Sequence, residues 1–370
     1  MRGARALLPA ALSLAGALGV SGCGTKFELP TESPSTPPLS EDTYFVKYRW
    51  AGFAGARDVL MTRGGQVFIA EPRPGSDSLR VRGYFRSKKD PTPTGVEMPD
   101  LAFPTQIAEG AAGALFVLDD ATPAAVKRFS ADGRNHIGTF SDQDWTETVN
   151  DTTRPDSRTR RITNSFVTLR GLAADPANNL YVAWTDSAFH DDLDLIDSTR
   201  SASTEIADVI RKYTVDGSPI LDVATRGTGS GFVDSPGGLA VSGSALFCAD
   251  IAKNWVQKVS ADVPSSPILV LDGLELAEDP GFSRPLDVAV DDSGFVYVAD
   301  TGKARVLKFD RDGDLDLRVD IPDSSSSAPT ATVDPIAVTA SKSLALVLDR
   351  TLGMVLVYEL RTSLDLKDDR

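Results

Sequence analysis

The chain has 370 residues, of which 41% are hydrophobic and 24% charged, a balance that excludes a wholly disordered protein and allows a large buried core. Its 52 acidic and 38 basic side chains give a formal net charge of -14, which repels a phosphate backbone and argues against a nucleic-acid partner. Two cysteines are too few for a disulfide framework.

The N-terminal residues have the charge layout of an export signal. Arg2 and Arg5 are followed by an apolar run of small residues that contains no acidic side chain. This run ends in the sequence VSGC at residues 20–23, which resembles the lipobox of a bacterial lipoprotein. The resemblance implies a signal peptide at residues 1–22 and a lipid attached to Cys23. A chance cysteine behind an ordinary export signal is the alternative.

A doubly or triply acylated Cys23 would hold the protein stably on a lipid bilayer. Gly24 stands where an Asp would retain a lipoprotein at the inner membrane, so in a Gram-negative cell the resemblance implies the outer membrane. Residues 23–41 are rich in Pro, Ser and Thr, and we expect an extended tether because proline fixes φ and removes a backbone donor. The folded part is predicted at residues 42–361, followed by a C-terminal tail at 362–370.

One segment of the chain contains a clear structural repeat. Residues 285–300 alternate branched and small side chains around the turn Asp-Asp-Ser-Gly, which predicts two strands of a hairpin. Two further strands are predicted at 305–309 and 315–319. This four-stranded unit resembles an NHL repeat, which forms one blade of a β-propeller.

Weaker copies of the unit recur along the chain. Equivalent second-strand positions are about 50 residues apart, with gaps of about 65 on either side of the third: Phe68, Phe116, Tyr181, Phe247, Tyr297 and Leu346. A four-stranded unit repeated at this period cannot bury both of its faces alone, so neighbouring copies must stack. The sequence therefore predicts an all-β fold, a six-bladed β-propeller of four-stranded antiparallel blades.

The sixth copy lacks a good fourth strand. Residues 44–50 alternate apolar and basic side chains without a blade of their own. Because an open ring would leave free strand edges, we expect this N-terminal strand to close the last blade.

Two long insertions interrupt the repeat pattern, at residues 141–164 and 186–207. Propeller topology attaches both to one face and to adjacent positions, so we expect them to touch and to form a recognition ridge over the central channel. The candidate ligand-binding residues on them are Trp145, Arg160, Arg161, Phe189, Asp191 and Asp192. The alternative is that these arginines and aspartates only pair with one another on the surface.

The second strands end in a series of carboxylates, at Glu71, Asp119, Asp250, Asp300 and Asp349, which Trp184 interrupts. Such a ring of acids could bind a cation or a basic peptide. The alternative is that each accepts hydrogen bonds from its own neighbouring loop. We include Asp250, Asp300 and Trp184 among the candidate ligand-binding residues.

Some propellers of the family that this unit resembles are enzymes, among them amidating lyases, and related six-bladed folds include gluconolactonase-like hydrolases. The chain has only His136 and His190, which cannot build a histidine metal site from inner strands. Residues 310–316 imitate a calcium loop, but Gly313 is out of place and we expect a hairpin turn. We assign no catalytic residue and no metal ligand; calcium is the one cofactor left open.

These observations favour a non-catalytic binding scaffold, anchored in the cell envelope, that binds a protein, peptide or glycan through the face carrying the insertions. The alternative is a calcium-dependent hydrolase or lyase with its site at the mouth of the channel. A monomer is expected.

Overall fold

The computed structural model describes residues 43–141, 145–149, 158–163, 166–193, 201–274, 279–319 and 333–361. The signal peptide, Cys23, the tether and the C-terminal tail lie outside these residues and stay predictions. In the described part of the chain, no helix is long and apolar enough to cross a membrane.

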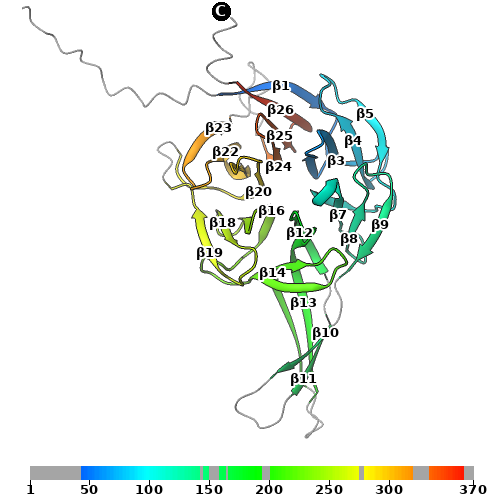
Figure 1. The fold of residues 1–370 in the computed structure, drawn as a ribbon, viewed down its shortest axis with the longest axis vertical. Coiled ribbons are helices and arrows are strands. Elements are labelled where there is room, and N and C mark those ends of the chain that lie inside the picture. Colours follow the sequence, from blue (N-terminus) through cyan, green and yellow to red (C-terminus); the bar gives the residue numbers. More distant parts are fainter. Residues whose placement is uncertain are drawn as a thin grey trace, which may run out of the picture. The chain divides into compact units, whose positions relative to one another are not determined.

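Six antiparallel sheets surround a central channel (Figure 1). Blade 1 contains β2 (Asp58–Met61), β3 (Gln66–Pro72), β4 (Leu79–Phe85) and β5 (Pro93–Glu97). Blade 2 contains β6 (Pro104–Glu109), β7 (Leu115–Asp119), β8 (Ala125–Phe129) and β9 (His136–Phe140). Blade 3 contains β12 (Phe166–Ala174), β13 (Leu180–Leu193), β14 (Ser201–Tyr213) and β15 (Pro219–Thr225), extended by β10 (Trp145–Val149) and β11 (Arg158–Thr163).

The other three blades follow the same order from the channel outward. Blade 4 contains β16 (Pro236–Ser242), β17 (Ala245–Asp250), β18 (Trp255–Ser260) and β19 (Pro267–Leu271). Blade 5 contains β20 (Pro285–Val290), β21 (Val296–Asp300), β22 (Arg305–Phe309) and β23 (Leu315–Val319). Blade 6 contains β24 (Pro335–Ala340), β25 (Leu344–Asp349) and β26 (Met354–Arg361), and its fourth strand is β1 (Thr43–Ala51). The predicted six-bladed all-β propeller is confirmed.

The N-terminal strand closes the ring as the sequence predicts. β1 pairs antiparallel with β26, from Thr43 opposite Arg361 to Ala51 opposite Met354. The Tyr44 hydroxyl is 2.9 Å from that of Tyr297, which ties this strand to blade 5 as well. The first strand of the chain is therefore the last strand of the ring.

The hydrophobic core is divided among the seams between blades. Each of six clusters combines residues of two neighbouring blades, including the seam where blade 6 meets blade 1. The repeated aromatic positions, such as Phe116 and Tyr297, are fully buried in these seams. Burying one large apolar side chain contributes about 1.5–3 kcal/mol. Because these side chains are buried between blades, most of the stabilisation of each blade depends on its neighbours.

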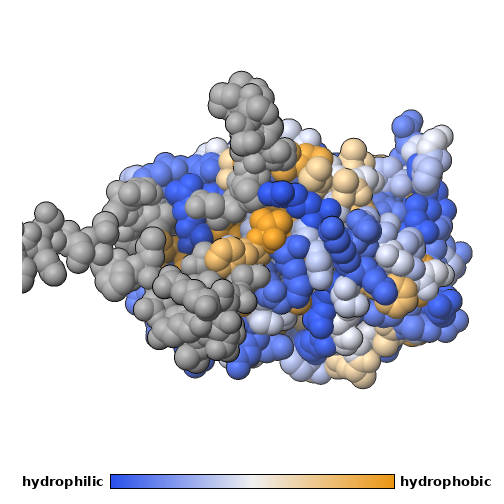
Figure 2. All heavy atoms as spheres, turned by 90° about the horizontal axis from the view of Figure 1, so that it is seen from above, coloured by the Kyte–Doolittle hydropathy of each residue, from blue (hydrophilic) through white to orange (hydrophobic). Residues whose placement is uncertain are grey.

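The described surface that faces the viewer in Figure 2 is largely hydrophilic. Figure 2 shows one side of the molecule, on which the hydrophobic residues of the described part appear as small groups among hydrophilic ones. Isolated apolar side chains such as Ile137 and Ile268, each 54% exposed, are normal for a surface.

Candidate functional site

The two insertions join in one projecting β-structure. β11 pairs with β13 from Thr159 opposite Leu193 to Thr163 opposite Phe189, and β10 pairs with β11. This pairing confirms the predicted contact between the insertions. We call β10, β11, residues 186–193 of β13 and residues 201–207 of β14 the arm.

The arm does not cover the central channel, contrary to our expectation. Figure 1 shows it extending outward from blade 3, away from the ring. β13 and β14 continue their ladder beyond the blade without a register shift, from Asp186 opposite Ala207 to Asp192 opposite Ser201. The direction of the arm thus follows the twist of blade 3 rather than the position of the channel.

Backbone register brings the candidate residues of the insertions together. Arg160 lies opposite Asp192, and Arg161 lies opposite Asp191, on β11 and β13. Opposite charges at directly paired positions stabilise a sheet by about 0.2–1 kcal/mol. Phe189 and Trp145 complete the group: Phe189 is opposite Thr163, and Trp145 is opposite Ile162.

Polar contacts fix the root of the arm. The Thr185 hydroxyl donates to Asp208 Oδ1 at 2.8 Å, and the Ser235 amide of the next blade donates to Asp208 Oδ2 at 3.1 Å. Arg170 Nε donates to the Thr185 hydroxyl at 3.2 Å, and Arg170 Nη1 donates to the Ser235 hydroxyl at 3.3 Å. The arm therefore begins on a fixed base between blades 3 and 4.

Trp184 lies where β13 enters the arm, and its side chain is fully buried. It packs in the seam between blades 2 and 3 with residues such as Leu169 and Phe140, and the Arg211 guanidinium lies 5.4 Å from its ring centroid. The place that an acid occupies in the other blades is thus filled by an apolar side chain of the core.

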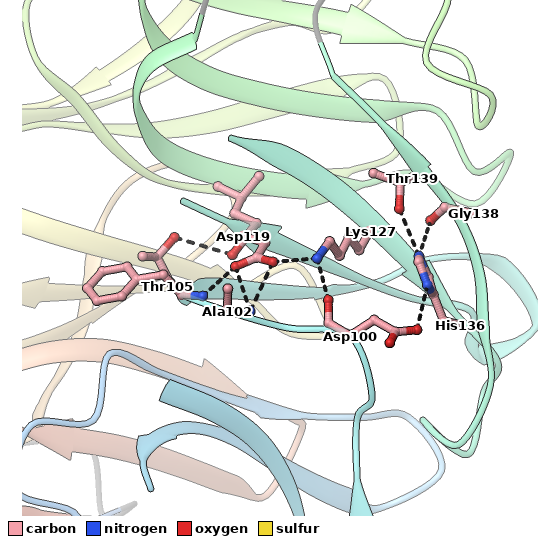
Figure 3. A network of polar contacts seen from close by, with 10 residues as sticks. Asp100, Ala102, Thr105, Asp119, Lys127, His136, Gly138 and Thr139 are labelled. Atoms are coloured by element: carbon pink, nitrogen blue, oxygen red, sulfur yellow. Dashed lines mark hydrogen bonds and ion pairs between the residues drawn. The ribbon is translucent and has the colours of Figure 1, made fainter. Parts of the chain in front are cut away.

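The acidic series has partners inside the blades, as Figure 3 shows for Asp119. This carboxylate is 1% exposed, accepts from the Ala102 and Phe103 amides, and forms an ion pair of 2.6 Å with Lys127. Lys127 also donates to the backbone carbonyl of Asp100. Asp119 thereby fixes the connection that enters blade 2.

Asp250 and Asp300, both predicted ligand contacts, are also fully buried. Asp250 accepts from the Asp234 amide at 2.8 Å, and Asp300 accepts from the Ser283 amide at 2.7 Å. Burial raises the pKa of both carboxyl groups, while these hydrogen bonds lower it. Arg305 also forms an ion pair of 2.8 Å with Asp300. The contacts of Asp250 and Asp300 therefore match the alternative that the sequence offered, in which each carboxylate accepts hydrogen bonds from its own neighbouring loop.

The first strands of all six blades line a central cavity of about 290 Å³. Its wall includes Asp58 of blade 1 and Asp287 of blade 5, which are only 8% and 9% exposed. Asp58 Oδ2 accepts from the Ile107 amide at 2.7 Å, and Asp287 Oδ2 accepts from the Val338 amide at 2.8 Å. Each carboxyl group therefore links its own blade to the next one.

The cavity carboxyl groups also influence each other's ionisation. Burial raises the pKa of Asp58 to about 6, and burial together with the charge of Asp58 raises the pKa of Asp287 to about 8. Sequence reasoning did not single out these two residues. The signal was present, because Asp58 and Asp287 occupy equivalent positions of two first strands.

The Asp58 and Asp287 carboxyl groups are not arranged as a calcium site. Calcium takes six to eight oxygen ligands, whereas the Asp58 and Asp287 carboxylates are engaged by backbone amides. Among the residues that the structure describes, no group of three His, Cys, Asp or Glu could hold a metal. The turn at 310–314 is a hairpin turn, in which Asp310 Oδ1 accepts from three successive amides.

Comparisons with known proteins support the fold. Residues 282–309, in blade 5, match the NHL repeat family. A gluconolactonase from Xanthomonas campestris is 15% identical, with 87% of this chain and 91% of that chain covered and a TM-score of 0.52. A streptogramin B lyase is 10% identical, with 86% and 98% covered and a TM-score of 0.51.

A chain of a nidogen/laminin complex is 16% identical, with 73% of this chain and 81% of that chain covered and a TM-score of 0.47. No curated protein matches the sequence. At their identities the gluconolactonase and the lyase show the propeller fold and leave the activity of this chain open.

Proposed function

We propose that this chain is a non-catalytic binding protein of the bacterial cell envelope, anchored through Cys23, that captures a protein partner with the arm. The arm carries this proposal, because two separate insertions are used to build one sheet beyond the ring. Loops that carry function are commonly placed on a rigid scaffold, and the closed propeller provides one.

The charges of the arm favour a macromolecular partner over a small molecule. Arg160, Arg161, Asp191 and Asp192 place both signs along two paired strands, with Trp145 and Phe189 beside them. Aromatic and arginine residues are enriched at protein interfaces, where they provide much of the binding energy. The arm presents this group on a sheet, whereas the cavity is enclosed by six strands.

The proposal is tested by shortening the arm at its root. Thr185 and Asp208 are register partners, so residues 186–207 can be replaced by an Asn-Gly turn that closes the hairpin there. We expect the shortened protein to keep its melting temperature and to lose capture of envelope proteins in a pull-down. The control Ile268→Ser, on the outer strand β19, should retain capture. Capture that survives the replacement would place the binding site outside residues 186–207.

The alternative function, a calcium-dependent hydrolase or lyase at the channel mouth, receives less support. It requires oxygen ligands that converge in the channel, and two of the buried carboxyl groups there, those of Asp58 and Asp287, link neighbouring blades. The gluconolactonase and the lyase resemble this chain in fold, and an unrelated function on the same fold is common.

A further inference from the structure

The arm has two sheet edges. Within the described strands, the sheet order is β10-β11-β13-β14, and β15 pairs only with the part of β14 from Val209 to Tyr213. Residues 201–207 of β14 therefore pair with β13 on one side alone, and β10 pairs with β11 alone. Each edge presents a row of backbone donors and acceptors that an extended chain can complete.

The β14 edge has few of the features that usually prevent strand addition. Natural edges are protected by proline, by charged side chains such as lysine, or by bulges. Residues 201–207 read SASTEIA, with Glu205 as the one charged side chain and without proline, and their pairing with β13 has no register shift. Three of the six outer strands of the ring contrast with this edge, since β5, β15 and β19 each begin with proline.

The two edges differ in charge. The strand segments 186–193 and 201–207 contain no Lys or Arg and four acidic residues, Asp186, Asp191, Asp192 and Glu205. On the other side, β10 and β11 contain one acidic residue, Glu147, against the three arginines Arg158, Arg160 and Arg161. The β14 side of the arm is thus acidic and the β10 side is basic, with all three arginines on the inner strand β11. Asp191 and Asp192 lie opposite two of these arginines, whereas Asp186 and Glu205 lie opposite uncharged residues.

We infer that residues 201–207 of β14 form a docking edge for an extended, basic segment of a protein partner, which adds to the arm as a further strand. The inference rests on the proposed function and specifies its partner. Backbone hydrogen bonds would supply affinity, and the acidic side of the arm would select a basic strand. Seven residues span about 23 Å at the rise of a β-strand, enough for a heptapeptide.

A second copy of this chain is the other conceivable occupant, because β11, next to its β10 edge, contains three arginines. Such pairing would join unlike edges head to tail and would give a ring or an open filament instead of a two-fold dimer. The formal net charge of -14 also opposes self-association. The charge pattern therefore favours a separate basic partner.

The test uses the full chain and a labelled nine-residue peptide that alternates lysine with valine and threonine. Binding is followed by fluorescence anisotropy at low salt. We expect the basic peptide to bind, and a version with glutamate in place of lysine to bind at least about tenfold more weakly. A basic peptide methylated on alternate backbone nitrogens should also lose at least about tenfold, since it keeps its charge but lacks strand hydrogen bonds.

Two proline variants locate the docking edge. Neighbouring residues of a strand direct their N–H groups to opposite sides, here toward β13 or toward the open edge. Of the two variants Ser203→Pro and Thr204→Pro, one therefore removes an N–H at the open edge, and the other removes a hydrogen bond to β13. We expect the outward variant to abolish peptide binding without lowering the melting temperature. The matched control Thr146→Pro, on the β10 edge, should leave peptide binding unchanged.

Equal binding of the methylated peptide would overturn the inference, as would peptide binding that survives both β14 proline variants. Self-association that the same prolines abolish would also overturn it, in favour of a second copy. These failures are distinguishable from failure of the proposed function. If shortening the arm abolishes protein capture but the peptide does not use β14, the arm still binds and only its docking edge is misplaced.

Discussion

At the scale of single residues, Asp287 shows how burial changes the chemistry of a carboxyl group. Its pKa in the folded protein is raised from 3.8 to about 8, chiefly by burial and then by the charge of Asp58. The folded protein therefore holds more protons than the unfolded chain between about pH 4 and pH 8, and its free energy of unfolding falls as the pH rises through that window. Since a tenfold change in proton affinity corresponds to about 1.4 kcal/mol, we expect this free energy to fall by a few kcal/mol.

The substitution Asp287→Asn tests this dependence. Asparagine can still accept the hydrogen bond from the Val338 amide but has no proton to lose. We expect the variant to be more stable than the original protein at pH 8.5, and its stability to depend less on pH. Chemical denaturation at pH 5 and pH 8.5 measures both effects. The exposed control Asp312→Asn should follow the original protein, and parallel curves for Asp287→Asn would contradict the raised pKa.

The sequence predicted the repeated acids at the ends of the second strands, but not Asp58 and Asp287. The first group follows a visible pattern, since the same residue type recurs at the same point of the repeat. Asp58 and Asp287 stand in first strands that read as ordinary alternation, and they become buried only when six strands meet around the channel. The burial of Trp184 was equally invisible, because the sequence shows the change of residue and not the seam that it fills.

At the scale of elements, the first strands show how one structural position serves different seams. Five equivalent residues lie opposite corresponding places in the second strands: Asp58, Gln106, Gly171, Asp287 and Ala337. Three of them accept a backbone amide of the next blade; for Gln106 the donor is Leu172, at 2.7 Å. Blade 3 has a glycine there and approaches blade 4 directly.

Substitution of Gly171 should open this seam. A Cβ atom at this position would lie 2.3 Å from the backbone oxygen of Gly237 and 3.1 Å from the Ala183 Cβ, so a backbone would have to move. We expect Gly171→Ala to lower the free energy of unfolding by about 1–3 kcal/mol, the usual cost of overpacking. Thermal and chemical denaturation measure the loss.

Gly138→Ala is the matched control, because no heavy atom lies within 4 Å of a Cβ there. It changes the same residue type in another strand of the ring, β9, and should leave stability within about 0.5 kcal/mol of the original. Equal effects of the two substitutions would show that backbone entropy, and not the seam, determines the cost.

The elements also show the limits of sequence reasoning about insertions. The lengths of residues 141–164 and 186–207 and their places in the repeat predicted their contact, which the pairing of β11 with β13 confirms. The lengths and places of the insertions did not predict the direction in which the arm extends. This direction depends on whether β13 and β14 continue their ladder beyond the blade, which is a property of strand pairing and not of composition.

At the scale of the whole molecule, ring closure was predictable because an open propeller leaves two unpaired edges. The alternation of apolar and basic side chains at residues 44–50 is typical of a strand, and the sixth copy of the repeat lacked a good fourth strand. The sequence did not show that this strand also reaches the neighbouring blades. Tyr44 meets Tyr297 of blade 5, while Trp50 packs against Tyr84 of blade 1 with ring centroids 6.3 Å apart.

Trp50 therefore tests whether closure stabilises the entire ring. It is fully buried, and its indole N–H donates to the Lys88 carbonyl of blade 1 at 3.1 Å, although its strand pairs with blade 6. We expect Trp50→Ala to lower the free energy of unfolding by about 3–5 kcal/mol, as large-to-small core changes do. Hydrogen exchange should show the amides of β26, the partner of β1, losing protection before those of β22.

Lys47→Ala, in the same strand as Trp50, is the control for this change, because it removes a partly exposed ion pair with Glu359 and a cation–π contact with Tyr48 but no buried side chain. Its cost should be about 0–1 kcal/mol, and the protection of β26 should not change. If Trp50→Ala lowered stability while β26 kept its protection relative to β22, the indole would contribute packing alone. Preferential loss at β26 would instead show that the cooperativity of all six blades depends on the strand that joins the two ends of the ring.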